Sequence, residues 1–312
     1  LAAGEVMLRI DAVGICGSDM HAYHGHDPRR VPPLILGHEL AATIVAGPQS
    51  GKRVTVNPLI TCGDCEYCVG GRDNLCANRT MIGMTRPGGF AELMSIPAAS
   101  LIDIPQDMGV RQAALTEPAA TALHALNVAA RALSRPLPES RVLVQGGGAI
   151  GLLTALLLKS YGCRDIELAE TNALRRASAA LTGACNAFDP VVTPAREDAF
   201  DLVVDAVGGA ATRKTALAAV KAGGVVVHVG LMDWASEIDM RRLTLAEITL
   251  IGTYTYTTAD LRATVQALYR GAFGDLAWVE ERALGDGAAA FAAIDQGRAA
   301  AAKIVPRPAR RA

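Results

Sequence analysis

Residues 141–151 constrain the fold of this chain more than any other stretch. The apolar run 142–144 is typical of a buried strand, and three glycines with the spacing Gly-x-Gly-x-x-Gly follow it and open an apolar, helix-prone segment. Gly146 permits a tight turn, Gly148 lets the backbone approach phosphates, and Gly151 lets helix and strand pack closely. The free amides and the dipole of the helix start favour an anion, so the pattern predicts a site for a dinucleotide pyrophosphate. The predicted contacts in this turn are Gly146, Gly148, Ala149, Ile150 and Gly151.

This pattern alone could also be an ordinary glycine turn, and a nearby acid favours the cofactor interpretation. A second strand expected at 166–169 ends just before Glu170, which lies 19 residues after Gly151. This is close to the ~20 residues expected for the acid that binds the adenosine ribose hydroxyls. A carboxylate there repels a 2′-phosphate and favours NAD over NADP. Arg175 and Arg176 follow closely, however, and an arginine nearby can accommodate that phosphate.

Strand and helix signals alternate after residue 141. Helical runs separate six expected strands, which predicts one doubly wound parallel sheet. Val207 and Val229 end two of these strands, on the side of the sheet where a cofactor would lie, although the glycines beside them could be turn residues only. The expected strands are 142–145, 166–169, 187–189, 202–207, 225–229 and 248–253.

Length and charge restrict the classes of protein that fit. A chain of 312 residues predicts about two domains, and a net charge of −1 gives no sign of a nucleic-acid or anionic-membrane partner. No apolar run reaches the ~18 residues of a membrane span, and no signal-peptide pattern opens the chain. We therefore expect a cytoplasmic protein with neither nucleic-acid nor membrane partners.

Four of the seven cysteines are crowded into residues 62–76. Four thiolates on a loop that contains Gly and Asp can close a tetrahedral zinc site with no position left for substrate, as in a structural zinc site. The alternative is a set of free or disulfide-bonded cysteines. The predicted ligands are Cys62, Cys65, Cys68 and Cys76.

A second candidate metal site combines Cys16, His38 and Glu39. A thiolate, an imidazole and a carboxylate suit zinc, and three protein ligands with one open position are typical of a catalytic site. The alternative is that Cys16 is a small buried hydrophobe and His38 a hydrogen-bonded loop residue, because spacing alone does not show that they meet. The short strands expected at 6–13, 40–45 and 52–56 indicate an antiparallel, partly closed β domain around these residues.

Several motifs together resemble the zinc-dependent medium-chain alcohol dehydrogenase family, in its polyol, secondary-alcohol and threonine dehydrogenase branch. The dinucleotide turn follows them where that family has it, so the resemblance covers nearly the whole chain. The motifs, in chain order, are Cys16-Gly17-Ser18-Asp19-x-His21, Gly37-His38-Glu39, the four-cysteine group, Gly88-Gly89-Phe90-Ala91-Glu92 and Thr116-Glu117-Pro118.

The resemblance implies roles for individual residues. Cys16 and His38 would bind a catalytic zinc, and Glu39 would be a ligand or exchange with water. Glu117 would be the remaining ligand or an acid one water away, although either glutamate could be an ordinary ion-paired carboxylate. Two further positions match the hydroxyl beside the bound alcohol and the histidine that passes its proton outward, namely Ser18 and His21.

The resemblance also implies an architecture and a reaction. Residues 1–120 and 275–312 would form a discontinuous catalytic domain with a structural-zinc lobe at 58–80, and residues 121–274 a dinucleotide-binding Rossmann domain. Two zinc ions and NAD would serve hydride transfer between a secondary alcohol or polyol, or the matching carbonyl, and the cofactor. The composition of 248–256 suits an edge strand, so a homodimer or homotetramer is expected.

Two alternatives to a zinc alcohol dehydrogenase remain at this stage. A metal-independent quinone or enone reductase of the same fold would lack the cysteine group and the Gly-His-Glu motif. A cofactor-binding sensor or structural protein without turnover would have no chemical need for Cys16, Ser18, His21 and His38. Polyol relatives often carry an arginine where Thr255 stands here, which makes a polyol substrate less secure.

Overall fold

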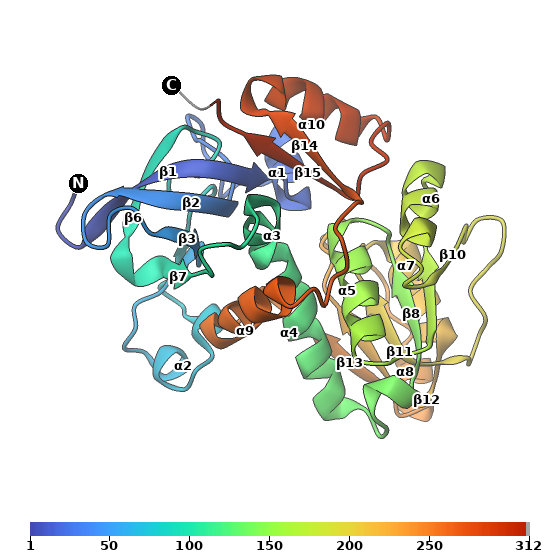
Figure 1. Cartoon of the computed structure of the whole chain (residues 1–312). Helices are drawn as coiled ribbons and strands as arrows, with labels where there is room; N and C mark the ends of the chain where they lie inside the picture. Colours follow the sequence, from blue (N-terminus) through green and yellow to red (C-terminus); the bar gives the residue numbers. More distant parts are fainter. Residues whose placement is uncertain (310–312) are drawn as a thin grey trace.

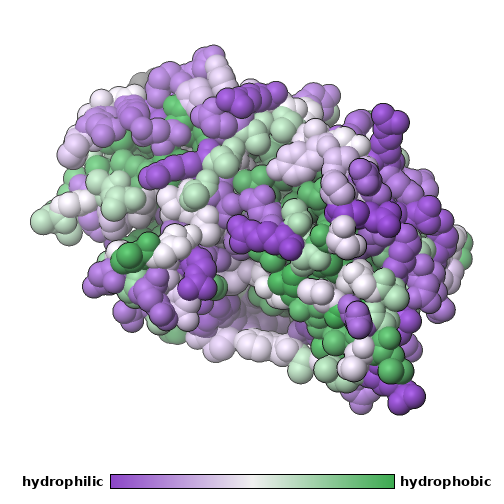
Figure 2. Space-filling view, turned by 90° about the horizontal axis from the view of Figure 1, so that it is seen from below, coloured by the Kyte–Doolittle hydropathy of each residue, from purple (hydrophilic) through white to green (hydrophobic). Residues whose placement is uncertain are grey.

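The computed structural model describes residues 1–309 and contains two large β-sheets (Figure 1). The antiparallel sheet and the parallel sheet lie in different halves of the molecule, and the end of the chain returns to the first half. Seen from below, hydrophilic residues cover much of the surface, and hydrophobic residues gather on the half that carries the parallel sheet (Figure 2). Every helix within residues 1–309 is too short or too polar to cross a membrane.

The N-terminal half is built on a five-stranded antiparallel sheet with the order β6-β1-β2-β3-β7. Val6, Leu8 and Ile10 alternate along β1 and are buried, because successive side chains of a strand point to opposite faces. The predicted antiparallel β structure is confirmed. The strands are β1 (Glu5–Gly14), β2 (Glu39–Ala46), β3 (Arg53–Val56), β6 (Leu93–Pro97) and β7 (Leu101–Asp103).

The second sheet has six parallel strands in the order β10-β9-β8-β11-β12-β13, which confirms the doubly wound prediction. All six residues of β11 are buried, as expected for a strand covered on both faces. The strands are β8 (Arg141–Gln145), β9 (Asp165–Ala169), β10 (Asn186–Phe188), β11 (Phe200–Asp205), β12 (Val220–His228) and β13 (Thr249–Gly252). The helices between them are α5 (Ala149–Ser160), α6 (Ala173–Leu181), α7 (Ala210–Ala219) and α8 (Met240–Leu245).

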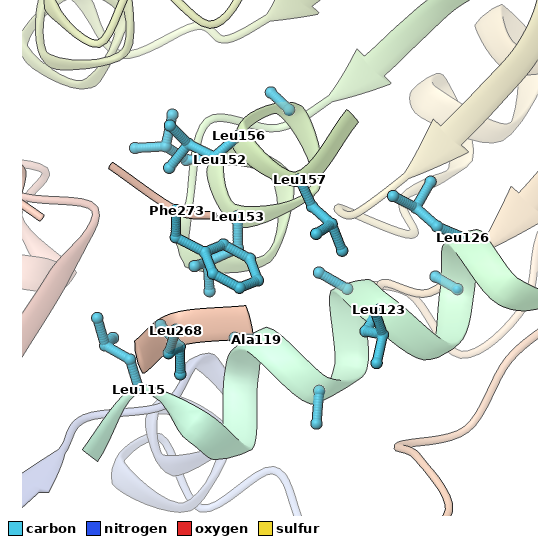
Figure 3. Close-up of a cluster of buried hydrophobic side chains, with 14 of the residues drawn as sticks. Leu115, Ala119, Leu123, Leu126, Leu152, Leu153, Leu156, Leu157, Leu268 and Phe273 are labelled. Atoms are coloured by element: carbon cyan, nitrogen blue, oxygen red, sulfur yellow. The ribbon is translucent and has the colours of Figure 1, made fainter. Parts of the chain in front are cut away.

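Helix α4 (Thr116–Ala132) connects the two halves of the core. Its apolar residues recur every three or four positions and so share one face, which packs against α5 and the end of α9 (Thr258–Tyr269) (Figure 3). The labelled side chains are Leu115, Ala119, Leu123, Leu126, Leu152, Leu153, Leu156, Leu157, Leu268 and Phe273. This packing fixes the start of α4, where Glu117 lies, relative to the parallel sheet.

The end of the described chain returns to the first sheet. The amide of Ile15 donates to the carbonyl of Ile304 at 3.0 Å, so β15 (Lys303–Arg307) lies beside the end of β1. β15 pairs in parallel with β14 (Val279–Ala283), and α10 (Gly287–Asp295) joins the two strands. The polar sequence between the helical runs 259–269 and 287–296 predicts a loop, and this prediction is wrong, because β14 lies there. The charged side chains of β14 hide its strand pattern, since Glu281 is ion-paired with Arg111 and Arg307.

Short elements complete the described chain. β4 (Leu59–Ile60) and β5 (Thr80–Met81) form a two-stranded sheet at the base of the cysteine loop. The loop itself contains α2 (Glu66–Val69) and the 3₁₀ turn η1 (Asp73–Leu75). The remaining short α-helices are α1 (Gly17–Tyr23) and α3 (Val110–Ala114), and the other 3₁₀ turns are η2 (Ala98–Ser100), η3 (Leu137–Glu139) and η4 (Leu284–Asp286).

Candidate active site and metal centres

The register of β1 and β2 brings Cys16 and His38 together. Gly14, the last residue of β1, pairs with Glu39, the first residue of β2. Cys16 follows this pair on one strand and His38 precedes it on the other, because the strands are antiparallel. Two residues far apart in sequence thus meet at the open end of one strand pair.

The ligand atoms of Cys16, His38 and Glu39 all lie within 4.8 Å of one another. His38 and Glu39 are buried, and Glu39 lies directly over Gly14, where an added Cβ would come 2.1 Å from Glu39 Oε2. Lys303 donates from Nζ to both Glu39 oxygens at 2.7 Å. The set predicted from the sequence therefore converges, and β15 contributes a buried cation to it.

Asp19 lies beside His38 and beside the backbone of Cys16. It is fully buried, accepts a hydrogen bond from the Cys16 amide through Oδ2 at 3.0 Å, and places Oδ1 3.6 Å from His38 Nδ1. Burial lowers the pKa of His38, but the charges of Asp19 and Cys16 outweigh this effect and raise it to about 10. A carboxylate behind one imidazole nitrogen leaves the other free to bind a metal ion.

Glu117 lies near this set but outside the group of three ligand atoms within 4.8 Å. Its Oε1 accepts a hydrogen bond from the hydroxyl of Tyr256 at 2.8 Å, and both residues are buried. Burial raises the pKa of Glu117 to about 7, and burial together with the Glu117 charge raises the pKa of Tyr256 well above its usual value.

Ser18 and His21 lie on α1, one turn apart and therefore on one side of the helix. Ser18 Oγ is 3.5 Å from His38 Nε2. Arg30 donates from Nη2 to Ser18 Oγ at 3.0 Å and from Nη1 to the Ser18 carbonyl at 2.7 Å. Burial and then the charge of Arg30 lower the pKa of His21, so its neutral form is favoured.

The four cysteines of the loop after β4 form a second compact group. Their sulfur atoms also lie within 4.8 Å of one another, with Cys62 to Cys68 at 3.8 Å, Cys65 to Cys68 at 3.5 Å and Cys62 to Cys76 at 3.5 Å. Disulfide sulfurs are only ~2.05 Å apart, and all seven cysteines of the chain are free. Four sulfurs about 2.3 Å from a tetrahedral zinc ion would be about 3.8 Å apart, so the spacing fits zinc.

The glycine turn after β8 has the geometry that the sequence predicted. Gly146 has φ +96°, and an added Cβ at Gly151 would lie 1.8 Å from the Gly146 carbonyl oxygen, which requires glycine for close packing. An added Cβ at Gly148, the N-cap of α5, would meet no protein atom within 4 Å. Open space at the start of α5, where Ala149 and Ile150 follow, suits a phosphate group.

Glu170 follows β9 and is bound to this turn. Its Oε2 accepts a hydrogen bond from Gly147 at 2.8 Å, and its Oε1 accepts from the Asn172 amide at 2.7 Å and from Arg175 at 3.3 Å. Arg176 donates to the Glu170 and Thr171 carbonyls at 2.9 and 2.6 Å and pairs with Asp189 at 3.0 Å, not with the Glu170 carboxylate. The carboxylate and one of the two predicted arginines therefore meet beside the glycine turn.

Val207 and Val229 lie just past the strands that the sequence assigned them to. β11 ends at Asp205 and β12 at His228, and both valines stand in the loops that follow. An added Cβ at Gly146 would come 2.7 Å from Val207, and one at Gly230 would come 2.2 Å from the carbonyl carbon of Val207. The loops after β8, β11 and β12 thus pack together at one edge of the sheet, where a cofactor would lie.

Four residues around the metal group received no role from sequence reasoning. They are Asp19, Arg30, Tyr256 and Lys303. Asp19 stands within a quoted motif, and its position three residues after Cys16, as the N3 acid of a capping box, was a usable signal. The other three meet the site through contacts that no sequence spacing reveals.

Comparison with known proteins identifies the family. The model described as "Alcohol dehydrogenase GroES-like domain" matches residues 2–106, and the one described as "Zinc-binding dehydrogenase" matches residues 149–270. L-galactonate-5-dehydrogenase of Escherichia coli (strain K12) is 33% identical over 276 residues, covering 82% of this chain and 77% of the relative.

Two solved structures share the fold of nearly the whole chain. A zinc-binding dehydrogenase of Sinorhizobium meliloti 1021 bound to NADP has a TM-score of 0.86 at 30% identity and covers 98% of this chain and 92% of its own. Acetophenone reductase of Geotrichum candidum NBRC 4597 in complex with NAD has a TM-score of 0.87 at 27% identity, and the match covers 97% of this chain and 89% of the reductase chain. The chain therefore belongs to the zinc-dependent medium-chain alcohol dehydrogenase family and is an NAD(P)-dependent oxidoreductase that acts on alcohols or polyols.

Proposed function

We propose that this enzyme interconverts a secondary alcohol or polyol and its carbonyl with NAD, at a zinc ion held by Cys16, His38 and a carboxylate. The convergence of three ligand atoms within 4.8 Å, with Asp19 behind the imidazole, carries this proposal. Glu39 is the third ligand in this arrangement, and Glu117 is the acid that completes the set or holds a water beside it.

The charge balance of the site supports a bound cation. Lys303, which pairs with Glu39, and Arg30, which pairs with Asp27, are the buried cations nearby, and neither neutralises all of the acidic groups of the site, namely Cys16, Asp19, Glu39 and Glu117. Burial raises the pKa of Asp19 as it raises that of Glu117, so burial opposes the charged form of both carboxyl groups, and a bound cation would offset this cost. Thiolate with imidazole and carboxylate suits zinc better than magnesium, and zinc there would act as a Lewis acid on the substrate oxygen.

The surrounding side chains have the geometry to orient a substrate and move its proton. Arg30 occupies one acceptor position of Ser18 Oγ, which leaves the other free to accept a hydrogen bond from a substrate hydroxyl. Ser18 Oγ would accept the substrate proton while it gives up its own hydroxyl proton, and His21, one turn along α1, would carry that released proton toward solvent. The lowered pKa of His21 fits this role, because a neutral imidazole has an open acceptor nitrogen.

Glu170 supports NAD as the preferred cofactor. Its carboxylate is buried beside the glycine turn and bound by the Gly147 and Asn172 amides. A 2′-phosphate at this position would meet that negative charge, whereas ribose hydroxyls could donate to it. Arg175 already pairs with the same carboxylate, so it is less available to a phosphate.

We assign a second zinc ion to the four-cysteine group, at residues 58–80. We also assign residues 1–120 and 275–312 to a discontinuous catalytic domain and residues 121–274 to the cofactor domain, with residues 310–312 outside the described chain. The hydrogen bond between Ile15 and Ile304 supports this division, and its first boundary falls within α4. Limited proteolysis between the two parts would test it.

The seven cysteines form no disulfide bond in the described chain and four of them group as metal ligands, which supports a cytoplasmic location that cell fractionation would test. L-galactonate-5-dehydrogenase and acetophenone reductase, two similar proteins, are named for different substrates, so the comparison gives no single substrate for this chain. Thr255 stands where polyol relatives often have an arginine, so simple secondary alcohols belong in the panel with polyols and galactonate.

The test is cofactor reduction on that panel with NAD and NADP, for the native protein and for Cys16→Ala. We expect turnover with at least one alcohol, a kcat/KM at least about tenfold higher with NAD, and no measurable turnover for Cys16→Ala. Cys163→Ala, which removes a buried thiol outside both groups, is the control and should keep native turnover. Cofactor binding without reduction would instead support a non-catalytic sensor.

A further inference from the structure

The loop between β13 and α9 is held by the cysteine lobe, which is defined here as residues 58–80. Asn74 donates to the Tyr254 carbonyl at 2.9 Å, and the Thr258 amide donates to Asp73 Oδ1 at 3.1 Å. The Thr258 hydroxyl also bonds to Asp73 Oδ2. These contacts hold both ends of the loop, although about 180 residues separate the partners in sequence.

Side-chain packing strengthens the same contact. The guanidinium carbon of Arg79 lies 4.7 Å from the centre of the Tyr254 ring, a cation–π geometry. Tyr254 also packs against a buried apolar cluster at the base of the lobe, formed by Leu59 within the lobe and by Met81 and Met84 just after it. The lobe therefore contacts this loop through hydrogen bonds, a cation and an apolar surface.

The held loop carries a strained residue beside the tyrosine of the active site. Thr255 has φ +48°, a conformation that is uncommon for a β-branched residue and persists only where the surroundings enforce it. The next residue, Tyr256, is fully buried and donates its hydroxyl to Glu117 Oε1 at 2.8 Å. The orientation of Tyr256 thus depends on a backbone that the lobe holds in place.

We propose that the cysteine lobe is a clamp that positions Tyr256 against Glu117, and that Asp73 and Asn74 are positioning residues for the reaction although they touch no reacting group. Cys76 follows Asn74 by two residues, so the same turn that presents Asp73 and Asn74 delivers one thiolate of the lobe. The lobe then contributes to turnover and not only to stability. This inference rests on the proposed function in one respect, the place of Glu117 in the reaction site.

A double-mutant cycle with Asp73→Ala and Tyr256→Phe tests the clamp. Each single variant should lower kcat about tenfold, as for other residues behind an active site, with KM for NAD within twofold of native. Because Asp73 acts through Tyr256, the double variant should be no more than twofold slower than Tyr256→Phe alone. Glu66→Ala removes an exposed carboxylate of the same lobe and should keep native kcat.

Two further measurements separate positioning from a general structural effect. In Asp73→Ala, the amides of residues 254–258 should exchange hydrogen faster than in native protein, while those of β11 keep the native rate. Zinc content should equal that of native protein. If Asp73→Ala loses zinc or unfolds, Thr258→Val takes its place, because it removes the hydroxyl contact with Asp73 from outside the lobe. Thr258→Val should then show the same lower kcat and the same faster hydrogen exchange at residues 254–258.

The inference is overturned if the effects of Asp73→Ala and Tyr256→Phe multiply, or if either variant keeps kcat within twofold of native. In that case turnover of native protein and its loss in Cys16→Ala would leave the proposed function intact. A native protein without turnover on any substrate would refute the proposed function and this inference with it.

Discussion

At the scale of single residues, the site depends on groups that orient the predicted ligands. Asp19 holds both the Cys16 backbone and one side of His38, and Arg30 holds Ser18 from two directions. The side chain of Arg30 is only 2% exposed, and its charge is balanced by Asp27 at 2.8 Å. Only the planar fork of an arginine can reach Ser18, Asp27 and the Gly83 carbonyl at once.

Arg30→Lys should therefore lower kcat about tenfold, because a lysine keeps the charge but cannot make the fork of hydrogen bonds to Ser18. Steady-state kinetics, with zinc content and the thermal midpoint beside them, would measure this. Arg29→Ala is a matched control, since Arg29 binds the same Asp27 carboxylate but its side chain is 55% exposed. Native kcat in Arg30→Lys would show that the Ser18 contact has no role in turnover.

At the scale of elements, one carboxylate links α4 to the start of α9. Asp260 caps α9 through the Thr257 amide and hydroxyl, and it accepts hydrogen bonds from His124 at 2.7 Å and Asn127 at 2.8 Å on α4. Burial raises the pKa of Asp260, but the bonds to His124 and Thr257 outweigh this effect and lower it to about 2. His124 therefore links α4 to the start of α9 through this carboxylate.

Asp260→Ala should lower the free energy of unfolding by about 2–3 kcal/mol at pH 7, from the lost cap and the lost charged contact. The folded pKa of Asp260 is below its unfolded value, so its contribution is full above about pH 4 and is lost as the pH falls toward 2. Urea unfolding of native and variant protein at several pH values should show that the difference between their free energies of unfolding shrinks as the pH falls. Asp239→Ala, which removes the cap of α8 alone, should cost about 1 kcal/mol. A difference for Asp260→Ala that does not change with pH would contradict this account.

Sequence patterns predicted the parallel sheet well and the surroundings of the site poorly, for a physical reason. The glycine spacing at Gly146 and the apolar strands report local backbone needs, which a linear pattern contains. The contact of Tyr256 with Glu117 joins residues 139 positions apart, and Lys303 reaches Glu39 across 264 positions. Such contacts depend on packing of whole elements, so they needed the structure.

At the scale of the whole molecule, one edge of the parallel sheet is suited to a second copy of the chain. Within residues 1–309, β13 is an end strand of this sheet, and β12 is its neighbour. Leu250 on β13 is 38% exposed, and Leu245 and Met240 nearby in sequence are 71% and 60% exposed. An uncovered edge strand with apolar neighbours favours pairing around a twofold axis.

We therefore expect a dimer or tetramer at micromolar concentration in sedimentation. Leu250→Lys should shift the protein toward monomer, because a charge on the edge strand opposes pairing of two sheets. Leu181→Lys, which adds the same charge at a residue 90% exposed at the end of α6, should leave the assembly unchanged. Native protein that sediments as a monomer would contradict this expectation.

The number of zinc ions per chain tests the central claim, two separate zinc sites in one chain, most directly. Elemental analysis should find about two zinc ions in native protein and about one in Cys16→Ala, which loses turnover but keeps the four-cysteine site. One zinc ion in native protein, retained in Cys16→Ala, would show that the four-cysteine group alone binds metal, and it would contradict the proposed active site.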